Sequence, residues 1–378
     1  MSTLRVVVDQ IVAPVPGGIG RYTEELARAL IATAPAGAHV EGFASAITDD
    51  EHAHIRALLP GLGTLHKSAL ARRELSLAWQ HGFTPIPGSG MLHATSLLAP
   101  LRRHDRHRDL DSQVVVTIHD AVPWTHPETL TPRGVSWHKA MARRAERYAD
   151  AVVVPTHSVA ADLSELLDLG NRIRVIGGAP SSALRLPDDA DARARRLELP
   201  ERYIFAAGTL EPRKGLASLI RAMGDIPGDV PLLIAGPPGW GGVDVAAISA
   251  DVGIAEGRVR VVGRVDDPDL AVLFSRASAF VMPSLAEGFG LPVIEAFSLG
   301  TPVVHSDVPA LSEVAGGAGL EVTRGDGDGY PGRLADAIQG VLDDHALADR
   351  LAVSGKDRSK AFTWRDSAEK VWQLHADL

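Results

Sequence analysis

Short apolar runs that alternate with amphipathic segments are the feature that most constrains how this chain folds. In the first half the runs lie at 4–9, 39–45, 91–96, 113–120, 150–156 and 171–178. They are rich in Val and Ile with little polar alternation, which is typical of strands buried on both faces of a parallel sheet. The amphipathic segments between them are the expected crossover helices, so this half predicts a doubly wound α/β domain.

The alternation of apolar runs and amphipathic segments stops once and then resumes. Around residues 181–200 the sequence contains two prolines and a charge cluster, which is typical of a linker between domains. Further strand candidates follow at 202–208, 230–236, 257–263, 278–283 and 300–306. We therefore expect two consecutive α/β domains, with the boundaries 1–183 and 201–362 and a linker at 184–200.

Composition narrows the classes of function. The 378 residues carry a net charge of −9, which argues against general nucleic-acid binding. The first half is nearly neutral and holds 12 of the 15 histidines, so the negative charge lies in the second half. There is no cysteine, which excludes a disulfide framework, a thiolate metal site and a cysteine nucleophile.

Neither a signal peptide nor a membrane-spanning segment is expected from the sequence. The N-terminal apolar run extends only from Val6 to Val8 and ends at Asp9, which is too short for a signal peptide. No stretch approaches the roughly 18 apolar residues that a spanning helix needs. We expect a cytoplasmic protein that at most lies on the inner face of a membrane.

The most informative stretch is PSLAEGFGLPVIEAFSLGTPVV at 283–304, where a glycine-rich loop follows a strand and precedes a helix. Pro292 suits the first turn of that helix, because its missing N–H costs nothing there. Backbone N–H groups at a helix start bind anions, and glycines allow close approach of a phosphate. The residues expected to bind in this way are Gly288, Phe289, Gly290 and Leu291.

Two carboxylates accompany this loop. Glu287 lies just before the glycines, and we expect Glu295, eight residues later, in the first turn of the helix. Glu295 can accept hydrogen bonds from a ribose diol, although for Glu295 taken alone an acidic residue favoured by the helix dipole is the better explanation. Glu287 can accept from sugar hydroxyls or stabilise positive charge at an anomeric carbon. The whole string after a strand favours a binding site.

A second strand–loop–helix unit at 202–223 carries Arg213 and Lys214 at the expected helix start. The helix dipole does not favour cations there, but a bound diphosphate would. Alone, the pair is explained as well by solvated side chains near Glu211. Together with the 283–304 loop, it favours phosphate binding. No GxxxxGK motif is present, so a P-loop enzyme is not supported.

The first half offers two weaker candidates. Gly17, Gly18 and Gly20 follow the first strand and precede a helix, without forming the GxGxxG fingerprint. His119 and Asp120 end a buried strand, where a histidine is usually structural but can also face a ligand. We expect Asp120 to orient local backbone or an acceptor hydroxyl.

These motifs together resemble a known family. Glu287 and Glu295 fit an E-x7-E pattern, and EGFGLPVIEA, GGIGRY, the central HD, the RKG loop and the C-terminal aromatic–helix segment are similar to family 4 of the retaining glycosyltransferases. The resemblance implies the GT-B fold: two facing Rossmann-like domains, with the helix 363–378 crossing back onto the first. It also implies transfer from a nucleotide-sugar, first guess GDP-mannose, to a glycan or lipid-linked acceptor, with no metal or other cofactor.

The resemblance assigns roles to the residues that match. The catalytic set is His119, Glu287, Arg213 and Lys214: Arg213 and Lys214 neutralise the leaving diphosphate, and His119 positions the transferred sugar. Glu295 holds the ribose, and Gly288, Phe289, Gly290 and Leu291 hold the sugar with Glu287. Gly17, Gly18, Gly263 and Val265 complete the donor-binding set. No residue is placed as a covalent nucleophile, so the acceptor is expected to attack on the face from which the phosphate departs.

Other readings remain open. The chain could be a nucleotide-sugar epimerase of the same architecture, or a non-catalytic nucleotide-sugar-binding subunit of a glycan-assembly complex. The basic segments 101–109 and 139–147 are explained either as solvated faces, with Glu146 as a local partner, or as a patch for anionic lipid. The D-x-D pairs Asp189–Asp191 and Asp326–Asp328 are interpreted as solvated loops rather than metal ligands.

Overall fold

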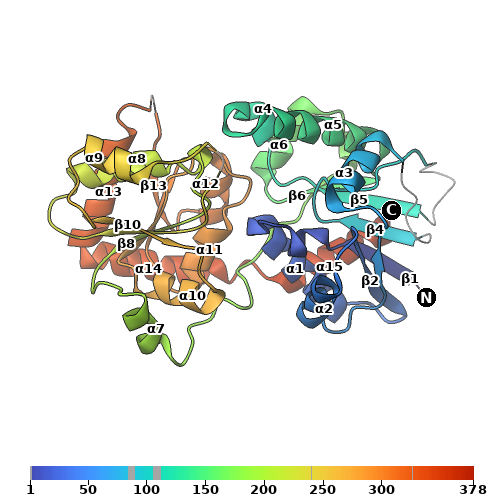
Figure 1. The fold of residues 1–378 in the computed structure, drawn as a ribbon, viewed down its shortest axis with the longest axis horizontal. Helices are drawn as coiled ribbons and strands as arrows, with labels where there is room; N and C mark the ends of the chain where they lie inside the picture. Colours follow the sequence, from blue (N-terminus) through green and yellow to red (C-terminus); the bar gives the residue numbers. More distant parts are fainter. Residues whose placement is uncertain (1, 84–89, 105–111, 240, 326) are drawn as a thin grey trace. The chain divides into compact units, whose positions relative to one another are not determined.

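The computed structural model describes residues 2–83, 90–104, 112–239, 241–325 and 327–378. The chain divides into two compact units, each built around its own sheet (Figure 1). Unit 1 comprises Met1–Thr125, Pro132–Gly178 and Thr363–Leu378, and unit 2 comprises His126–Thr131 and Ala179–Phe362. Among the described residues, no helix is both long enough and apolar enough to cross a bilayer.

Unit 1 contains a seven-stranded parallel sheet in the order β3-β2-β1-β4-β5-β6-β7. Its central strands are Val-rich and buried, because helices cover both faces of the sheet. The strands are β1 (Ser2–Val7), β2 (Ala38–Ala44), β3 (Leu65–Lys67), β4 (Gly90–Ala94), β5 (Ser112–Thr117), β6 (Ala151–Val154) and β7 (Ile173–Val175). The order reverses between β1 and β4, which is the place where ligands bind in open α/β sheets.

The helices of unit 1 come from both ends of the chain. Those of the N-terminal part are α1 (Gly17–Ala32), α2 (Asp49–Leu58), α3 (Arg72–His81), α4 (Val122–Thr125), α5 (Pro132–Tyr148) and α6 (His157–Leu166), with short 3-10 turns η1 (Asp9–Val12) and η3 (Gly170–Arg172). The last helix, α15 (Trp364–Asp377), packs against α1. Trp372 Nε1 donates to the carbonyl of Leu30 (3.2 Å), and Ser367 Oγ donates to the carbonyl of Gly177 (2.8 Å).

Unit 2 contains a six-stranded parallel sheet in the order β10-β9-β8-β11-β12-β13. Its strands are β8 (Ile204–Ala207), β9 (Leu232–Ala235), β10 (Val259–Gly263), β11 (Ala279–Met282), β12 (Val303–Ser306) and β13 (Leu320–Val322). Its helices are α7 (Ala190–Arg196), α8 (Leu216–Asp225), α9 (Val245–Asp251), α10 (Asp267–Arg276), α11 (Leu291–Ser298), α12 (Pro309–Ala315), α13 (Tyr330–Asp343) and α14 (His345–Ser359), with 3-10 turns η2 (Pro127–Thr129) and η4 (Pro212–Lys214). Phe205, Phe274 and Phe280 pack ring against ring at the centre of one face.

Two local features differ from what the sequence pattern suggests. The stretch around 181–200 contains helix α7, whose Ala190 and Ala194 pack on Val272. Its Arg193 and Arg196 bind Asp269 of α10 (2.7 and 2.6 Å). Prolines and charges suggested a linker there, but these contacts stabilise a helix. The first glycine cluster does not precede α1 but forms its first turn. At Gly20 a Cβ atom would lie 2.4 Å from the Cβ of Pro16, so close packing at the helix start requires a glycine.

Candidate functional site

Two loops of unit 2 carry the predicted cations and the predicted carboxylate. After β8 the chain enters η4, which contains Arg213 and Lys214, and after β11 it enters the loop that contains Glu287. β8 and β11 are hydrogen-bonded neighbours, with Ala279 opposite Ile204. Because they are parallel, their carboxyl ends meet at the same edge of the sheet, and the two loops meet there as well.

The main chains of these loops are in direct contact. The N–H of Leu285 donates to the carbonyl of Arg213 (2.8 Å). Gly215, which ends η4, has φ +66°, and a Cβ at this position would lie 2.0 Å from the carbonyl oxygen of Pro283. Only glycine fits both this backbone conformation and this approach. The RKG sequence therefore sets the distance between the loops as well as supplying charge.

The carboxylate of Glu287 binds side chains from both loops. Its Oε1 accepts from Lys214 Nζ (2.6 Å) and from Ser284 Oγ (2.8 Å), and its Oε2 accepts from Arg213 Nη1 (3.2 Å). Its side chain is only 8 % exposed. Burial by itself raises the pKa of Glu287, but the charges of Lys214 and Arg213 outweigh it and hold that pKa below its ordinary value. Glu287 is therefore an ionised, fixed carboxylate at neutral pH.

The two cations differ in their surroundings. Arg213 also donates to Glu211 Oε1 (2.7 Å) and to the carbonyl of Ala286 (3.2 Å), so its guanidinium spans both loops. Burial and the charge of Arg213 lower the pKa of Lys214, while Glu287 partly offsets them. Arg213 thus binds Glu211 and also the carboxylate of the second loop, whereas phosphate binding by the pair stays a prediction.

The helix that follows the second loop begins as expected but places one carboxylate differently. Gly290 caps α11 with φ +93°, and a Cβ there would lie 2.4 Å from Leu311 Cδ2. Pro292 lies in the first turn, as predicted. Glu295, however, is the fifth residue of α11 and lies in its second turn, because the helix begins at Leu291. It is 3 % exposed, so a solvated residue favoured only by the helix dipole does not describe it.

Other predicted donor-binding residues lie near the same edge of the sheet. Gly263 ends β10 with φ +76°, and its carbonyl accepts from Gly236 N (2.9 Å) after β9. Val265 follows Gly263 and packs on the core of unit 2. In the sheet, β9 lies between β10 and β8, and β11 lies on the other side of β8. Gly263 and Val265 therefore follow a strand on one side of the Lys214 loop, and Glu287 follows a strand on the other side.

Several supporting residues were missed by sequence reasoning. Arg324 donates to the carbonyl of Leu285 and, through Nε, to Asp307 Oδ1 (2.6 Å). Ser306 Oγ donates to the carbonyl of Ser284 (2.6 Å). These bonds fix the backbone of the Glu287 loop at Ser284 and Leu285. Ser284 could have been found as the residue three positions before Glu287, but Ser306 and Arg324 carry no such signal.

His119 in unit 1 is held by main chain and by an aromatic ring. It follows β5 and is half-buried, and its Nε2 donates to the carbonyl of Thr95 (2.8 Å). This bond leaves Nδ1 as an acceptor in the neutral ring. The rings of Tyr22 and His119 pack edge to face, with centroids 4.9 Å apart. Burial lowers the pKa of His119, which favours the neutral ring. Asp120 accepts from the N–H of Val122, the first residue of α4 (3.1 Å).

The early glycines also lie in unit 1. Gly17 and Gly18 are the first two residues of α1, which follows η1 after β1. Gly17 has φ +56°, and a Cβ there would meet open space. Their backbone N–H groups belong to the start of a long helix rather than to a loop that precedes it. Such groups lack intrahelical partners and are the kind that bind anions.

The remaining candidates do not form a site in the structure. Asp189 binds Arg193 (2.8 Å) and Asp191 binds Arg276, so this D-x-D pair has cationic partners. Asp326 lies outside the described residues. Within the described ranges, no cluster of histidine and acidic side chains is arranged to hold a metal ion.

The basic segments are only partly described. Residues 105–109 of the segment 101–109 lie outside the described residues. In the segment 139–147, Arg143 binds Glu146 (3.2 Å), as the solvated-face interpretation expected, and Lys139 Nζ lies 6.0 Å from the ring centroid of Trp124.

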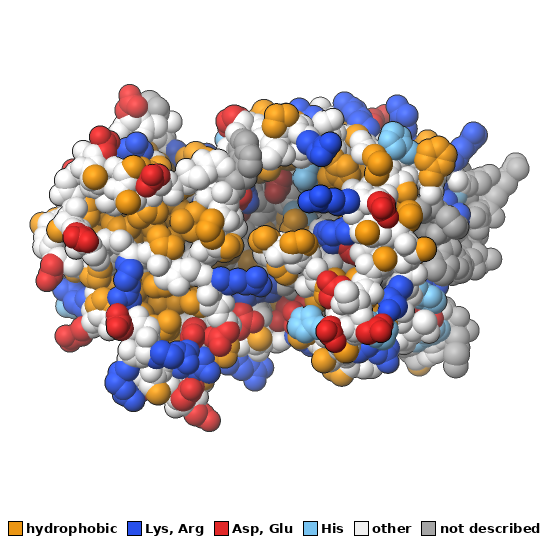
Figure 2. Space-filling view, in the orientation of Figure 1, with side chains coloured by type: hydrophobic (Ala, Val, Ile, Leu, Met, Phe, Trp, Pro, Cys, Tyr) orange, Lys and Arg blue, Asp and Glu red, His pale blue; other side chains and the backbone are white. Residues whose placement is uncertain are grey.

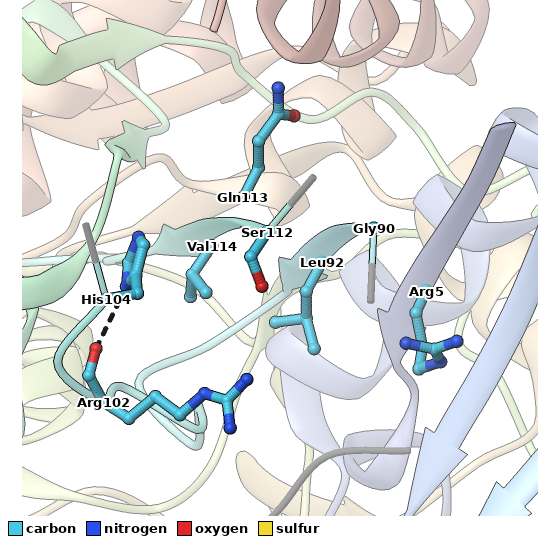
Figure 3. A pocket seen from close by; sticks show the side chains of 8 residues that line it. All are labelled: Arg5, Gly90, Leu92, Arg102, His104, Ser112, Gln113 and Val114. Carbon is cyan, nitrogen blue, oxygen red and sulfur yellow. Dashed lines mark hydrogen bonds between the residues drawn. The ribbon is translucent and has the colours of Figure 1, made fainter. Parts of the chain in front are cut away.

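Unit 1 also contains a small pocket (Figure 3). It is lined by Gly90 and Ser112, the first residues of β4 and β5, together with Arg102 and His104. These are the amino ends of the strands. The pocket therefore lies at the opposite edge of the sheet from His119 and is separate from the candidate site.

Two families match the chain. Residues 16–179 match the family described as Glycosyltransferase Family 4, and residues 201–344 match the family described as Glycosyl transferases group 1. O-antigen chain mannosyltransferase B of Escherichia coli is 37 % identical over 168 residues, which are 43 % of this chain and 43 % of that protein. A D-inositol 3-phosphate glycosyltransferase of Nocardioides is 30 % identical over 248 residues, 60 % of this chain and 53 % of that protein. The matches span about half the length of these relatives.

Solved structures match over the whole chain. Sucrose-phosphate synthase from Thermosynechococcus elongatus has a TM-score of 0.73 at 25 % identity and covers 100 % of this chain and 99 % of its own. HepE of Anabaena, crystallised with UDP-glucose, has a TM-score of 0.72 at 18 % identity and covers 100 % of both chains. The fold is GT-B, with two Rossmann-like parallel sheets and the C-terminal helix on the first unit. With both family matches and this fold, the chain belongs to family 4 of the glycosyltransferases.

Proposed function

We propose that this protein is a retaining hexosyltransferase that takes a sugar from a nucleotide-sugar donor and forms an α-glycosidic bond to a glycan or lipid-linked acceptor. The observation that carries the proposal is the cluster in unit 2, where Arg213 and Lys214 from one loop meet Glu287 from another. Such a cluster provides cations for a diphosphate and a fixed carboxylate for a sugar within a few ångströms of each other.

The chemistry follows from these charges. The acceptor oxygen forms a bond to the anomeric carbon while the bond from that carbon to the diphosphate breaks, and the acceptor proton passes to the departing phosphate oxygen. Arg213 and Lys214 stabilise the negative charge that develops on the diphosphate, which replaces the role of a metal ion. Glu287 accepts from sugar hydroxyls and stabilises positive charge at the anomeric carbon.

The other residues have binding roles in this proposal. Glu295, buried in α11, accepts from the ribose hydroxyls, and the N–H groups of residues 288–291 face the phosphate or sugar. Gly263 and Val265 border the nucleotide. On unit 1, His119 presents Nδ1 as an acceptor for a hydroxyl of the transferred sugar, and the start of α1 at Gly17 and Gly18 binds phosphate or acceptor.

Mannose from GDP-mannose is our first choice of donor. It is supported by the similarity to a mannosyltransferase of Escherichia coli at 37 % identity. The structural similarity to a protein that binds UDP-glucose makes that donor the principal competitor. Both donors contain a diphosphate, so both fit the cations of the cluster, and the base and the sugar hydroxyls must be distinguished elsewhere.

The test is incubation of the purified protein with GDP-mannose and with UDP-glucose. A rise in melting temperature first shows which donor binds, and the products are then separated. Free nucleoside diphosphate with released or transferred sugar, unchanged by EDTA, supports the proposal. An epimerised donor, or binding without any turnover, would contradict it and favour the epimerase or the non-catalytic subunit.

We also propose that unit 1 contacts an anionic membrane surface through α5 and the neighbouring α3. Leu77 is 57 % exposed and Phe83 is 77 % exposed, at and just beyond the C-terminal half of α3. Arg143 and Arg147 are exposed on α5, and Figure 2 shows Lys and Arg side chains gathered around α5. Exposed apolar side chains beside cations are typical of a surface that binds anionic lipid.

Vesicle flotation tests this contact. The protein should float with vesicles that contain phosphatidylglycerol and stay behind with phosphatidylcholine alone. The double variant Arg143→Gln/Arg147→Gln should lose this binding, whereas Arg365→Gln, an exposed change on α15, should keep it. Equal binding of all three proteins would exclude α5 as the contact surface.

A further inference from the structure

The segment that connects unit 2 to the C-terminal helix carries an aromatic side chain on each side of Thr363. Phe362 is the last residue of unit 2, and Trp364 is the first residue of α15 in unit 1. Thr363 caps α15 by accepting from Asp366 N (3.0 Å), so the helix begins at a fixed point. The two rings are therefore separated by one residue, although each packs within a different unit.

On the unit 2 side, Phe362 packs against the loop that carries the proposed donor site. Its ring meets the ring of Phe289 edge to face, with centroids 5.8 Å apart and an angle of 84°. The guanidinium of Arg358 lies 4.9 Å from the Phe362 centroid and is itself fixed by the carbonyls of Glu313 and Val314. Phe289 lies between Glu287 and the first turn of α11, so this stack limits where the loop can move.

On the unit 1 side, Trp364 begins a second chain of rings. It packs against Tyr22 with centroids 5.5 Å apart and an angle of 68°, and Tyr22 packs against His119 at 4.9 Å and 86°. Trp364 is 9 % exposed and Tyr22 is 4 % exposed, so both rings are fixed by burial. His119 is thus restrained by the carbonyl of Thr95 and by the ring of Tyr22.

We propose that Phe362 and Trp364 are positioning residues, Phe362 for the Phe289 loop and Trp364, through Tyr22, for His119. Attachment of α15 to unit 1 does not by itself require the ring of Trp364, since Trp372 and Ser367 already bind α15 to unit 1 by hydrogen bonds. The inference rests on the proposed function only for the consequence that activity changes. The positions of His119 and of the loop are properties of the protein itself.

The experiment compares matched aromatic deletions in the full chain. Trp364→Leu and Tyr22→Leu remove the rings that restrain His119, and Phe362→Leu removes the ring behind Phe289. Trp372→Leu is the control, because it makes the same chemical change on the same helix but contacts Leu30 instead of Tyr22. Trp364→Phe and Phe362→Tyr keep a ring and serve as conservative rescues.

The first readout is NMR of the histidine side chains, with the His119 signals assigned by their loss in His119→Asn. In Trp364→Leu and Tyr22→Leu the Nε2 signal of His119 should shift, and the pKa of His119 should rise toward its ordinary value as water reaches the ring. Trp372→Leu should lower the melting temperature without these changes. The inference fails if the His119 signals are unchanged in Trp364→Leu, or change equally in Trp372→Leu.

The second readout is hydrolysis of GDP-mannose. Misplacing a positioned group by about an ångström costs up to roughly 100-fold in rate, so we expect kcat to fall 10- to 100-fold in Trp364→Leu with KM within about twofold. Phe362→Leu should instead raise KM and move the backbone amide signals of Gly288 and Gly290, with both restored in Phe362→Tyr. If the wild type turns over neither GDP-mannose nor UDP-glucose, the proposed function fails, while the NMR readouts still decide this inference.

Discussion

In unit 2 the predicted site side chains bind one another, whereas in unit 1 the predicted histidine binds main chain and packs on a ring. Glu287 joins Arg213 and Lys214 across two loops, so removing one charge leaves the others unbalanced. His119 is held by the Thr95 carbonyl and by Tyr22, neither of which carries charge. Unit 2 should therefore respond most to changes of charge, and unit 1 most to changes of burial and packing.

The largest effect is expected for Glu287→Gln. The change removes the only carboxylate that Lys214 binds among the described contacts and leaves Arg213 with the carboxylate of Glu211. It should reduce sugar transfer by at least about 10²-fold and the free energy of unfolding by about 3 kcal/mol. Sugar release from GDP-mannose and urea unfolding followed by circular dichroism measure the two effects. The structure thus adds a loss of stability that the sequence pattern alone did not indicate.

The control is Glu41→Gln in unit 1. Glu41 is also a poorly exposed glutamate, and it binds Arg5 (3.0 Å) and His66 (2.9 Å). It should cost stability without lowering the rate constant for sugar release. Turnover near the wild-type value in Glu287→Gln would remove that residue from the mechanism and with it the distinction between the units.

Gly215→Ala should have the next largest effect. The substitution places a Cβ 2.0 Å from the Pro283 carbonyl in a left-handed conformation, so the two loops must separate, at a cost of about 2 kcal/mol or more. The matched change in unit 1 is Gly17→Ala, which also has positive φ but meets open space and should cost only about 1 kcal/mol. Melting temperatures of both variants test this order, which would be wrong if Gly17→Ala were the more damaging.

Acid should affect the two units in different ranges of pH. His93 of β4 and His375 of α15 are buried with ring centroids 5.8 Å apart, and burial lowers the pKa of His93 to about 4 and that of His375 well below its ordinary value. As the pH falls, these histidines take up protons in the unfolded chain before they do so in the folded protein, because their pKa is higher when unfolded. Unit 1 therefore loses stability as the pH falls from about 6.5 to about 4, by about 3 kcal/mol for His93. The Glu287 contribution is fully present above its ordinary pKa and is lost only as the pH falls further, through its lowered folded value.

Tryptophan fluorescence is a suitable probe, because five of the six tryptophans belong to unit 1. Melts between pH 7 and pH 4 should show a steady fall in the unit 1 transition, and the fall should be smaller in His93→Leu. An unchanged pH dependence in that variant would show that His93 is not a neutral, buried group. Circular dichroism of the whole chain gives the comparison with unit 2.

The sequence was informative where function requires charge or glycine, and less so where support comes from main chain. That Arg213, Lys214 and Glu287 lie close together could be predicted, because both loops follow strands of one parallel sheet, whose carboxyl ends meet at a single edge. Their roles in binding and catalysis stay a prediction. The turn of α11 that holds Glu295 could not be predicted, because it depends on where Gly290 caps the helix. The supporting role of Arg324 and Ser306 could not be identified from the sequence, because they bind the carbonyls of Leu285 and Ser284, 39 and 22 residues away.

The smallest effect should come from exposed charges outside the site. In the double variant Asp189→Asn/Asp191→Asn, the partners Arg193 and Arg276 lose exposed carboxylates, and such pairs contribute little because water screens them. Melting temperature and GDP-mannose hydrolysis should both stay within experimental error of the wild type, with or without EDTA. A loss of activity that manganese restores would instead make this D-x-D pair a metal site. That result would contradict the view that charges in unit 2 affect activity and stability mainly where they are buried between the Arg213–Lys214 loop and the Glu287 loop.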